Sequence, residues 1–165
     1  MHNRMRSAVL VLGIVLVLIG MVDGSDTLPQ SSITLERSMC FGTCPVYTVT
    51  LYQNGTVWYH GEQFVKEVGD RSEMLNATSF ETLLKACEEA GFFQMNDEYV
   101  KLDITDMPGA IITLQNGTDV KRVEHYHGDL HAPKKIIELE DLIDQTVQIS
   151  RWVGTGSDQI KEEMI

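Results

Sequence analysis

Two Asn-Gly pairs, each set between runs of β-branched and aromatic residues, constrain the fold of this chain more than any other feature. The runs are residues 47–52 and 56–60 around Asn54-Gly55, and residues 111–115 and 118–124 around Asn116-Gly117. An Asn-Gly pair tolerates the positive φ angles of a two-residue hairpin turn, and the flanking residue types suit a pleated surface. The sequence therefore predicts two antiparallel hairpins.

The pairing across the first turn decides which of its side chains share a face of the sheet. With two turn residues, Val49, Leu51 and Trp58 lie on one face, which we expect to be the core face. Val57 and Tyr59 then lie on the opposite face. The first hairpin is therefore expected to bury Trp58 and to leave Tyr59 outside the core.

Two further strands are expected beside these hairpins. Residues 33–37 alternate between apolar and polar side chains, and residues 64–68 form a second run before Gly69-Asp70. In the second hairpin Val120 and Val123 break strict alternation, which predicts a β-bulge between them.

Two stretches have the spacing of amphipathic helices. In the first, Thr78-Ser79-Phe80-Glu81 matches a capping box, and Gly91 is placed to end the helix as a left-handed cap. The buried stripe of this helix, about residues 79–90, is Phe80, Leu83, Leu84 and Cys87. The second helix covers about residues 133–149, with Pro133 in its first turn, and its buried stripe is Ile136, Leu139, Ile143 and Val147.

These elements predict one α+β domain over residues 33–152. Its mainly antiparallel sheet is built from the two Asn-Gly hairpins and the additional strands, with the two helices packed on it. Trp152 is expected to close the core. Residues 153–165 are expected to form a flexible acidic tail.

The N-terminus has the pattern of an export segment. Arg4 and Arg6 precede an uninterrupted apolar run over residues 8–22, which Asp23-Gly24-Ser25 ends. A charged start, an apolar run of this length and a small residue are typical of a secretory signal peptide. An uncleaved membrane anchor is the alternative, although a spanning helix needs about 20 apolar residues. Either interpretation of residues 1–24 places the rest outside the cytoplasm, with residues 25–32 as a linker.

The chain is acidic, with 13 Lys and Arg against 24 Asp and Glu and a net charge of −11. Removal of residues 1–24 lowers these counts to 11 and 23, which leaves about −12. Such a charge repels phosphates, so we expect no nucleic-acid partner. Membrane contact is expected only through the N-terminal segment, if it is not cleaved.

Cys40 and Cys44 are the first candidates for chemistry. Exported proteins meet an oxidising environment, where a pair this close tends to form a disulfide. A redox dithiol is an alternative, but such pairs usually have Cys-x-x-Cys spacing at a helix N-terminus. Here three residues intervene and a strand follows. We therefore favour a structural bridge, with a redox or a metal role left open, and treat Cys87 as a small core residue.

His125, His127 and His131 form the second candidate site, together with the aspartates Asp103, Asp106 and Asp129. Histidine and carboxylate side chains are metal ligands, and two histidines at a spacing of two share a face of a strand. The spacing matches no specific zinc motif, and a polar loop that enters a helix explains the same residues. We therefore expect no cofactor, and a metal here remains the alternative.

Three glycosylation sequons are present, at Asn54, Asn76 and Asn116. Export allows their modification in a host that performs it. Two of these asparagines have turn geometry as a sufficient reason, and the third precedes a helix. No Gly-x-Ser-x-Gly elbow or phosphate-binding glycine loop is present, so nucleophilic catalysis has little support.

The string Cys40-Phe-Gly-Thr-Cys-Pro-Val-Tyr47 resembles the signature of a family called domain of unknown function 6438. The resemblance extends over about residues 33–152. Weaker matches are the Asn-Gly-Thr-Val turn, Gly61, Phe92-Phe93, residues 105–108, His125-Tyr126, Ala132-Pro133 and Leu139-Glu140. It implies an exported or membrane-attached protein of bacteria or archaea, and it implies no activity.

The combined interpretation is an extracytoplasmic domain, secreted or membrane-anchored, that binds a small ligand or a protein partner and is not an enzyme. Two alternatives remain open at this point. One is a thiol–disulfide protein that uses Cys40 and Cys44. The other is a metal-dependent enzyme that uses His125, His127 and His131.

Overall fold

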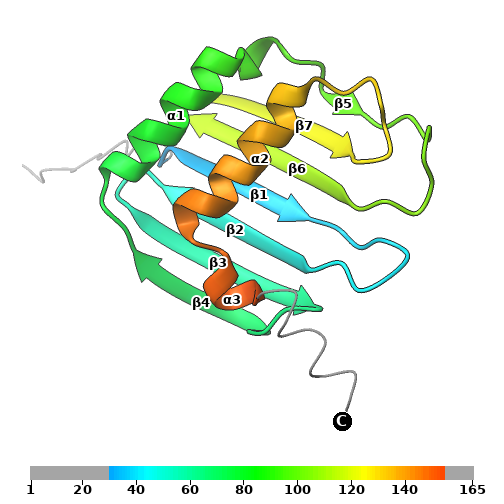
Figure 1. The fold of residues 1–165 in the computed structure, drawn as a ribbon. Helices are drawn as coiled ribbons and strands as arrows, with labels where there is room; N and C mark the ends of the chain where they lie inside the picture. Colours follow the sequence, from blue (N-terminus) through cyan, green and yellow to red (C-terminus); the bar gives the residue numbers. More distant parts are fainter. Residues whose placement is uncertain (1–29, 155–165) are drawn as a thin grey trace, which may run out of the picture.

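The computed structural model describes residues 30–154 (Figure 1). Its elements are β1 (Ser32–Arg37), β2 (Val46–Tyr52), β3 (Thr56–Gln63), β4 (Gly69–Met74), α1 (Thr78–Ala90), the 3₁₀ helix η1 (Phe92–Gln94), β5 (Glu98–Tyr99), β6 (Gly109–Asn116), β7 (Asp119–Tyr126), α2 (Lys134–Val147) and α3 (Ser150–Val153). The predicted export segment (1–24), most of the linker and the tail from residue 155 onward lie outside the described residues. None of the helices within residues 30–154 is long and apolar enough to cross a membrane.

The strands form one seven-stranded sheet in the order β4-β3-β2-β1-β6-β7-β5. Every pairing is antiparallel except that of β5 with β7, which is parallel. Helices α1 and α2 lie across one face of this sheet (Figure 1). The predicted α+β class, with a mainly antiparallel sheet and two packed helices, is confirmed.

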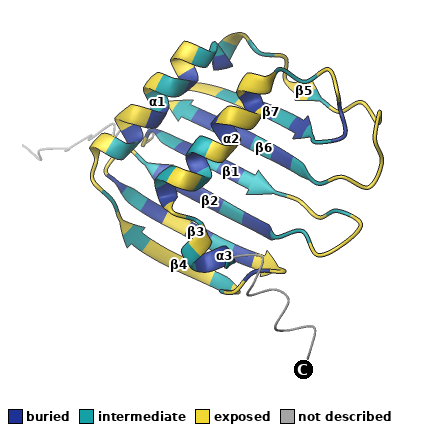
Figure 2. Ribbon diagram, in the orientation of Figure 1, coloured by how far each residue is buried: buried dark blue, intermediate teal, exposed yellow. Residues whose placement is uncertain are grey.

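The core lies between the sheet and the two helices, because alternate strand residues point toward the helices. Ile33 and Leu35 of β1, for example, are fully buried, whereas their neighbours are only partly covered. The same alternation is visible along the central strands in Figure 2, while the helices show their exposed residues on the outer side. Among the described residues no helix covers the second face of the sheet, which we call the open face.

The core face predicted for the first hairpin is wrong. Leu51 pairs with Val57 and Val49 with Tyr59, so Val57 and Tyr59 are buried and Trp58 is on the open face. The turn contains three residues, 53–55, because only Gly55 adopts a positive φ, of 89°. This turn is one residue longer than the predicted two-residue turn. The extra residue shifts the pairing by one, so each side chain of the returning strand lies on the opposite face from the one predicted.

Trp152 closes the core as predicted. It is buried, and its ring stacks on that of Tyr59 with the centroids 4.9 Å apart. The helix that carries it, α3, sits over the segment between β3 and β4, where the amides of Lys66 and Glu67 donate to the carbonyls of Val153 and Trp152. This contact explains why the strand predicted at residues 64–68 is wrong: that segment is a loop, and the strand β4 follows it.

The second hairpin is present, but its turn residues are Gly117 and Thr118, because Asn116 still pairs with Asp119. The bulge predicted between Val120 and Val123 is wrong, since pairing between β6 and β7 runs without a shift. Val120 simply faces solvent on the open side, while Val123 is buried. A register shift occurs instead in β2, between Val46 and Tyr47.

Helix α1 ends as predicted, since Gly91 is left-handed with φ 73° and its amide donates to the carbonyls of Cys87 and Glu88. The predicted capping box is wrong. The helix already includes Thr78, no side chain caps its first residues, and the Asn76 side chain accepts a hydrogen bond from the Thr78 amide instead. Cys87 is buried on the helix stripe, and burial raises the pKa of its thiol to about 11.

The connections between strands fall on two opposite edges of the sheet. We call one the hairpin edge: it contains the turns at residues 53–55 and 117–118 and the link at 75–77. Hydrogen bonds tie this edge together, since Ser31 accepts from the amides of Gln53 and Gly117, at 2.9 and 3.0 Å. The loop edge at the other ends of the strands contains the longer segments 38–45, 64–68, 100–108 and 127–133 (Figure 1).

Candidate functional site

A buried polar network lies where β1, β2 and β7 reach the loop edge. Its centre is Arg37, the last residue of β1, whose guanidinium donates to Glu140 at 2.6 Å and to Asp144 at 2.8 Å. Glu140 and Asp144 are four residues apart on α2, so both reach the same side of the helix. The Tyr47 hydroxyl donates to the second oxygen of Asp144 at 2.8 Å. One cation thus holds two carboxylates and, through Asp144, the start of β2.

Two histidines complete the network around Glu140. His125 Nδ1 donates to one carboxylate oxygen at 2.7 Å, and His127 Nε2 donates to the other at 2.8 Å. Their rings lie 4.8 Å apart, as expected for residues at a spacing of two on one face. Glu140 is only 1% exposed, and each of its carboxylate oxygens accepts a hydrogen bond. Among residues 30–154 no buried side-chain nitrogen or oxygen lacks a partner, so this network is fully satisfied.

The network fixes the charge of its members. Burial alone would raise the pKa of Glu140, but hydrogen bonds from His125 and His127 and the charge of Arg37 lower it to about 2. Burial raises the pKa of Tyr47, and the neighbouring charge of Asp144 raises it further. At neutral pH Glu140 is therefore ionised and Tyr47 is protonated. Neither group exchanges a proton there, which is the behaviour of a structural support rather than of an acid–base catalyst.

The disulfide predicted between Cys40 and Cys44 is present, with the two Cα atoms 5.7 Å apart. It closes the loop that connects Arg37 to Tyr47, so both ends of the loop enter the buried network. Between the cysteines, Phe41 is 89% exposed. The loop is thus held at its base by the network and across its middle by the bridge, while its tip points into solvent.

Segment 100–108 of the loop edge is bonded to this loop, and segment 127–133 is bonded to segment 100–108 in turn. The Phe41 amide donates to the carbonyl of Asp106 at 3.2 Å, and Asp106 itself has a left-handed backbone with φ 66°. The Ile104 amide donates to the carbonyl of Gly128 at 3.0 Å. A Cβ atom at Gly128 would lie 2.0 Å from the Ile104 carbonyl oxygen, so only glycine allows this approach. Segments 38–45, 100–108 and 127–133 therefore form one connected layer.

Large apolar side chains are exposed on this layer. We call them the loop-edge surface, which consists of Met39, Phe41, Val100, Leu102, Ile104, Met107 and Leu130. Leu102 and Leu130 are 72% and 69% exposed. These seven residues are more than half of the thirteen large hydrophobic residues exposed within residues 30–154. Exposed apolar residues scattered singly are ordinary, whereas these are concentrated on one edge of the sheet.

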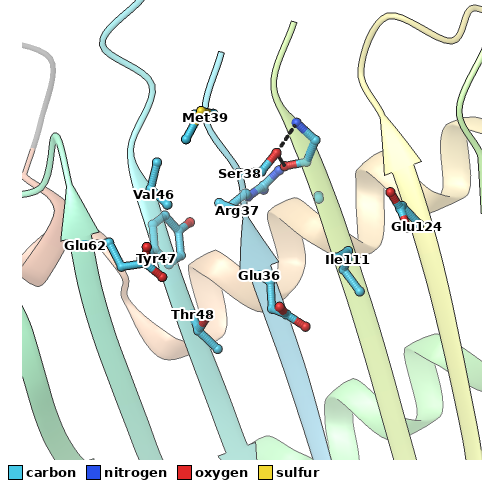
Figure 3. A pocket seen from close by; sticks show the side chains of 12 residues that line it. Glu36, Arg37, Ser38, Met39, Val46, Tyr47, Thr48, Glu62, Ile111 and Glu124 are labelled. Carbon is cyan, nitrogen blue, oxygen red and sulfur yellow. Dashed lines mark hydrogen bonds between the residues drawn. The ribbon is translucent and has the colours of Figure 1, made fainter.

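A hollow on the open face of the sheet adjoins this surface (Figure 3). It has a volume of about 280 Å³ and lies below Met39, which also belongs to the loop-edge surface. Its walls include Val46 and Ile111. Glu36, Glu62 and Glu124 stand around it, so the region beside the apolar surface is acidic.

The four residues predicted to share a ligand site are divided between three places. His125 and His127 meet at Glu140, as described. His131 lies apart, with its Nδ1 3.0 Å from Asp103 and 3.5 Å from Asp129. Asp106 contributes its carbonyl to the Phe41 amide. The Asp129 carboxylate, in the loop before α2, accepts from the amides of Lys101 and His131.

Either histidine group has the donor atoms for a cation. In His125, His127 and Glu140, and separately in Asp103, Asp129 and His131, one ligand atom from each residue lies within 4.8 Å of the others. In the first group, however, Arg37 already contacts the carboxylate. In the second, hydrogen bonds from Leu130, Lys101 and His131 already occupy the carboxylates. These contacts are sufficient to explain both groups without a metal.

The central residues of the network were missed from the sequence, although a signal was present. Arg37 continues the buried alternation of Ile33 and Leu35, and Glu140 lies on the helix stripe beside Leu139. A charged residue at a core position needs a partner of opposite charge. The two could have been paired on that ground, but the histidines could not have been assigned to them.

The comparison with protein-family models gives one match, to a domain of unknown function (DUF6438), over residues 31–147. The match covers more than half of the chain. This chain belongs to the DUF6438 family. All seven strands of the sheet, the disulfide loop and the polar network lie inside the matched residues, so they belong to the DUF6438 domain itself. The search of curated proteins finds no match.

Proposed function

We propose that this chain is an exported domain, secreted or held at the membrane by its N-terminal segment, that binds a protein partner through the loop-edge surface. The observation that carries the proposal is the concentration of exposed apolar residues on three loops that are bonded to one another. Apolar and aromatic side chains at the centre of an interface supply most of its binding energy. Phe41, at the tip of the disulfide loop, is the central contact in this proposal.

The rigidity of the loop edge supports this role. A long loop that is free in solution loses conformational entropy when it binds, and this loss weakens the complex. Here the disulfide, the network at Arg37 and the bonds between the segments restrict the loops before binding. The buried ion pairs add little net stability, since the free energy of desolvation offsets much of their attraction. Their position under the loops is consistent with a function in shaping this surface.

The position of the first described residue favours a protein partner over a lipid surface. Gln30, the first described residue, lies at the hairpin edge, so a membrane anchor in residues 1–24 would join the domain on the side away from the loop-edge surface. The glutamates around the hollow, and the net charge of the chain, repel anionic headgroups. The same glutamates suit a partner with basic residues around an apolar centre.

The two alternative functions have less support. A redox dithiol usually has a thiolate stabilised by a helix N-terminus or a neighbouring cation, whereas Cys44 leads through Pro45 directly into β2. A metal enzyme at His125, His127 and Glu140 would have to displace the Arg37 guanidinium, 2.6 Å from Glu140. A reduction potential well below about −300 mV, typical of structural disulfides, would argue against the redox function.

Photo-cross-linking in the cells that export the protein tests the proposal. One variant carries p-benzoylphenylalanine in place of Phe41, and the control carries it in place of Val120, which is 61% exposed at the hairpin edge. We expect a discrete protein adduct from position 41 and none of that mass from position 120. Excess purified wild-type domain should suppress the adduct, and excess F41S/L102S domain should not.

Two outcomes would contradict the proposal. Equal adducts from both positions would show that the loop edge has no preference for a partner. Adducts with lipid alone from position 41 would replace the protein partner with a membrane. Purified F41S/L102S domain must retain the circular dichroism of the wild type for the competition to count.

A further inference from the structure

The three Asn-x-Thr sequons lie together at the hairpin edge, although they are far apart in the sequence. Asn54 is in the turn between β2 and β3, Asn116 is the last residue of β6, and Asn76 precedes α1. The turn of Asn54 is bonded to the other two regions: the Leu75 amide donates to the Gly55 carbonyl at 2.8 Å, and Ser31 bridges Gln53 to Gly117. All three asparagines are exposed.

The side chains of two of these asparagines are oriented for modification. Asn54 Oδ1 accepts from the Thr56 amide at 2.9 Å, and Asn76 Oδ1 accepts from the Thr78 amide at 3.1 Å. In both, the bond uses the carbonyl oxygen of the side chain, and the Nδ2 atom, to which a sugar is attached, has no partner within residues 30–154. Asn116 has no side-chain hydrogen bond within residues 30–154. A glycan on Nδ2 would therefore break none of these contacts.

Chance does not readily account for this pattern. The chain has five asparagines, and three of them are followed two residues later by threonine. All three of these are at one edge, and none is near the loop-edge surface. Asn96, which is also exposed, is followed by Asp97-Glu98 and lacks the sequon. The sequons thus mark the edge that the N-terminal segment joins and leave the opposite edge uncovered.

We propose that Asn54, Asn76 and Asn116 carry N-linked glycans, which cover the hairpin edge of the exported domain. The donor is a glycan linked through phosphate or pyrophosphate to a polyprenyl lipid. The asparagine Nδ2 forms a bond to the anomeric carbon of the sugar and releases one proton. The bond between that carbon and the phosphate oxygen breaks, and the lipid phosphate leaves with the electron pair. The proposal depends on export and is independent of the partner proposed above.

Peptide mapping of the protein purified from the cells that naturally export it tests this inference. We expect a glycan mass on Asn54, Asn76 and Asn116 as the major species, and none on Asn96. Matched variants remove each sequon while the asparagine stays: T56A, T78A and T118A. Each variant should lose one glycan from the intact mass, because its sequon is removed. The hydrogen bonds donated by residues 56 and 78 come from the backbone amide, so they persist in alanine.

The outcomes are separable. A site found mainly unmodified in the native protein overturns the proposal for that site, and three unmodified sites overturn it entirely. A modification that persists in a threonine variant would show another chemistry and would also overturn it. Because the mapping of the wild-type protein is decisive by itself, a variant that fails to fold does not affect the conclusion.

Discussion

The two edges of the sheet are built in opposite ways. The hairpin edge joins its strands through turns of two or three residues, its exposed side chains are mainly polar, and hydrogen bonds at Ser31 and Gly55 link its segments. The loop edge uses longer segments that expose seven large apolar residues. It is held by a disulfide and by a buried network that joins residues up to 107 positions apart in the chain.

This difference shows which contacts hold each edge in its conformation. The hairpin edge depends on the turn chemistry of a few residues and on the hydrogen bonds at Ser31 and Gly55. The loop edge has three kinds of support: the covalent Cys40–Cys44 bridge, the ion pairs of Arg37 with α2, and the backbone hydrogen bonds between segments 38–45, 100–108 and 127–133. Long-range supports of this kind keep a surface in one shape, which is what recognition of a partner needs.

The largest effect is expected from Glu140→Ala, because it removes the acceptor shared by Arg37, His125 and His127. Loss of one partner from a buried ion pair leaves an uncompensated charge and costs about 3–5 kcal/mol of unfolding free energy. Glu138→Ala, at an exposed position of the same helix, is the control, with a change within about 0.5 kcal/mol. Urea unfolding measures both. Equal losses would show that the network does not support the fold.

Acid should weaken the loop edge through the same residue. The pKa of Glu140 falls from an ordinary 4.5 to about 2 on folding, so the ionised form stabilises the folded state above about pH 4.5. One pKa unit corresponds to about 1.4 kcal/mol, so the lowered pKa contributes about 3 kcal/mol to the unfolding free energy. This contribution is lost as the pH falls toward 2. Burial raises the pKa of Asp144, and this opposite shift reduces the net loss of stability in acid. Unfolding between pH 7 and 2 should show a shallower acid decline in Glu140→Gln.

The hairpin edge should respond to backbone changes instead. Gly55 has φ 89°, and a Cβ atom there would lie 2.4 Å from the Leu75 carbonyl oxygen. Gly117 has φ 62° and open space around it. Gly117→Ala should therefore cost about 1 kcal/mol from the left-handed backbone alone, and Gly55→Ala about 2–3 kcal/mol because strain and the clash add. A smaller loss at Gly55 than at Gly117, by thermal unfolding, would contradict the three-residue turn.

Removal of the disulfide should cost less global stability than the loss of Glu140. A bridge that closes so short a loop contributes about 2 kcal/mol by restricting the unfolded chain. In Cys40→Ser/Cys44→Ser we expect that loss, together with faster amide hydrogen exchange at residues 38–45. Exchange at the turns 53–55 and 117–118 should not change. Faster exchange at both edges would mean that the bridge stabilises the whole domain rather than the loop edge.

The sequence predicted the parts of this fold that depend on neighbours in the chain. Both hairpins, both helices, the left-handed cap at Gly91 and the disulfide are set by residues a few positions apart, and all are present. The face of β3 was predicted wrongly because it depends on the backbone angle of Asn54, which the residue type does not fix. The strand β4 was missed because it is a polar edge strand that lacks apolar alternation.

The site was predicted less well, because its contacts are long-range. The grouping of His125 with His127 followed from their spacing. Their partner Glu140 and its cation Arg37 are 103 residues apart, and only the packing of α2 on the sheet brings them together. Likewise, no local pattern indicates that Leu102, Leu130 and Phe41 lie at one edge. That arrangement follows from the order of the strands, which places the loop-edge ends of β1, β6, β7 and β5 in one row.

The most direct test of the loop-edge surface uses two methionines that the chain already contains. Met39 is on this surface and Met74 is at the hairpin edge, and both are 63% exposed. Dilute peroxide oxidises exposed methionine to the sulfoxide, and peptide mapping gives the rate at each residue. In protein purified from the exporting cells, we predict similar rates. On the intact cells, where the partner is present, the rate at Met39 should fall several-fold while that at Met74 stays the same. An unchanged rate at Met39, or an equal fall at both residues, would contradict a partner at the loop edge.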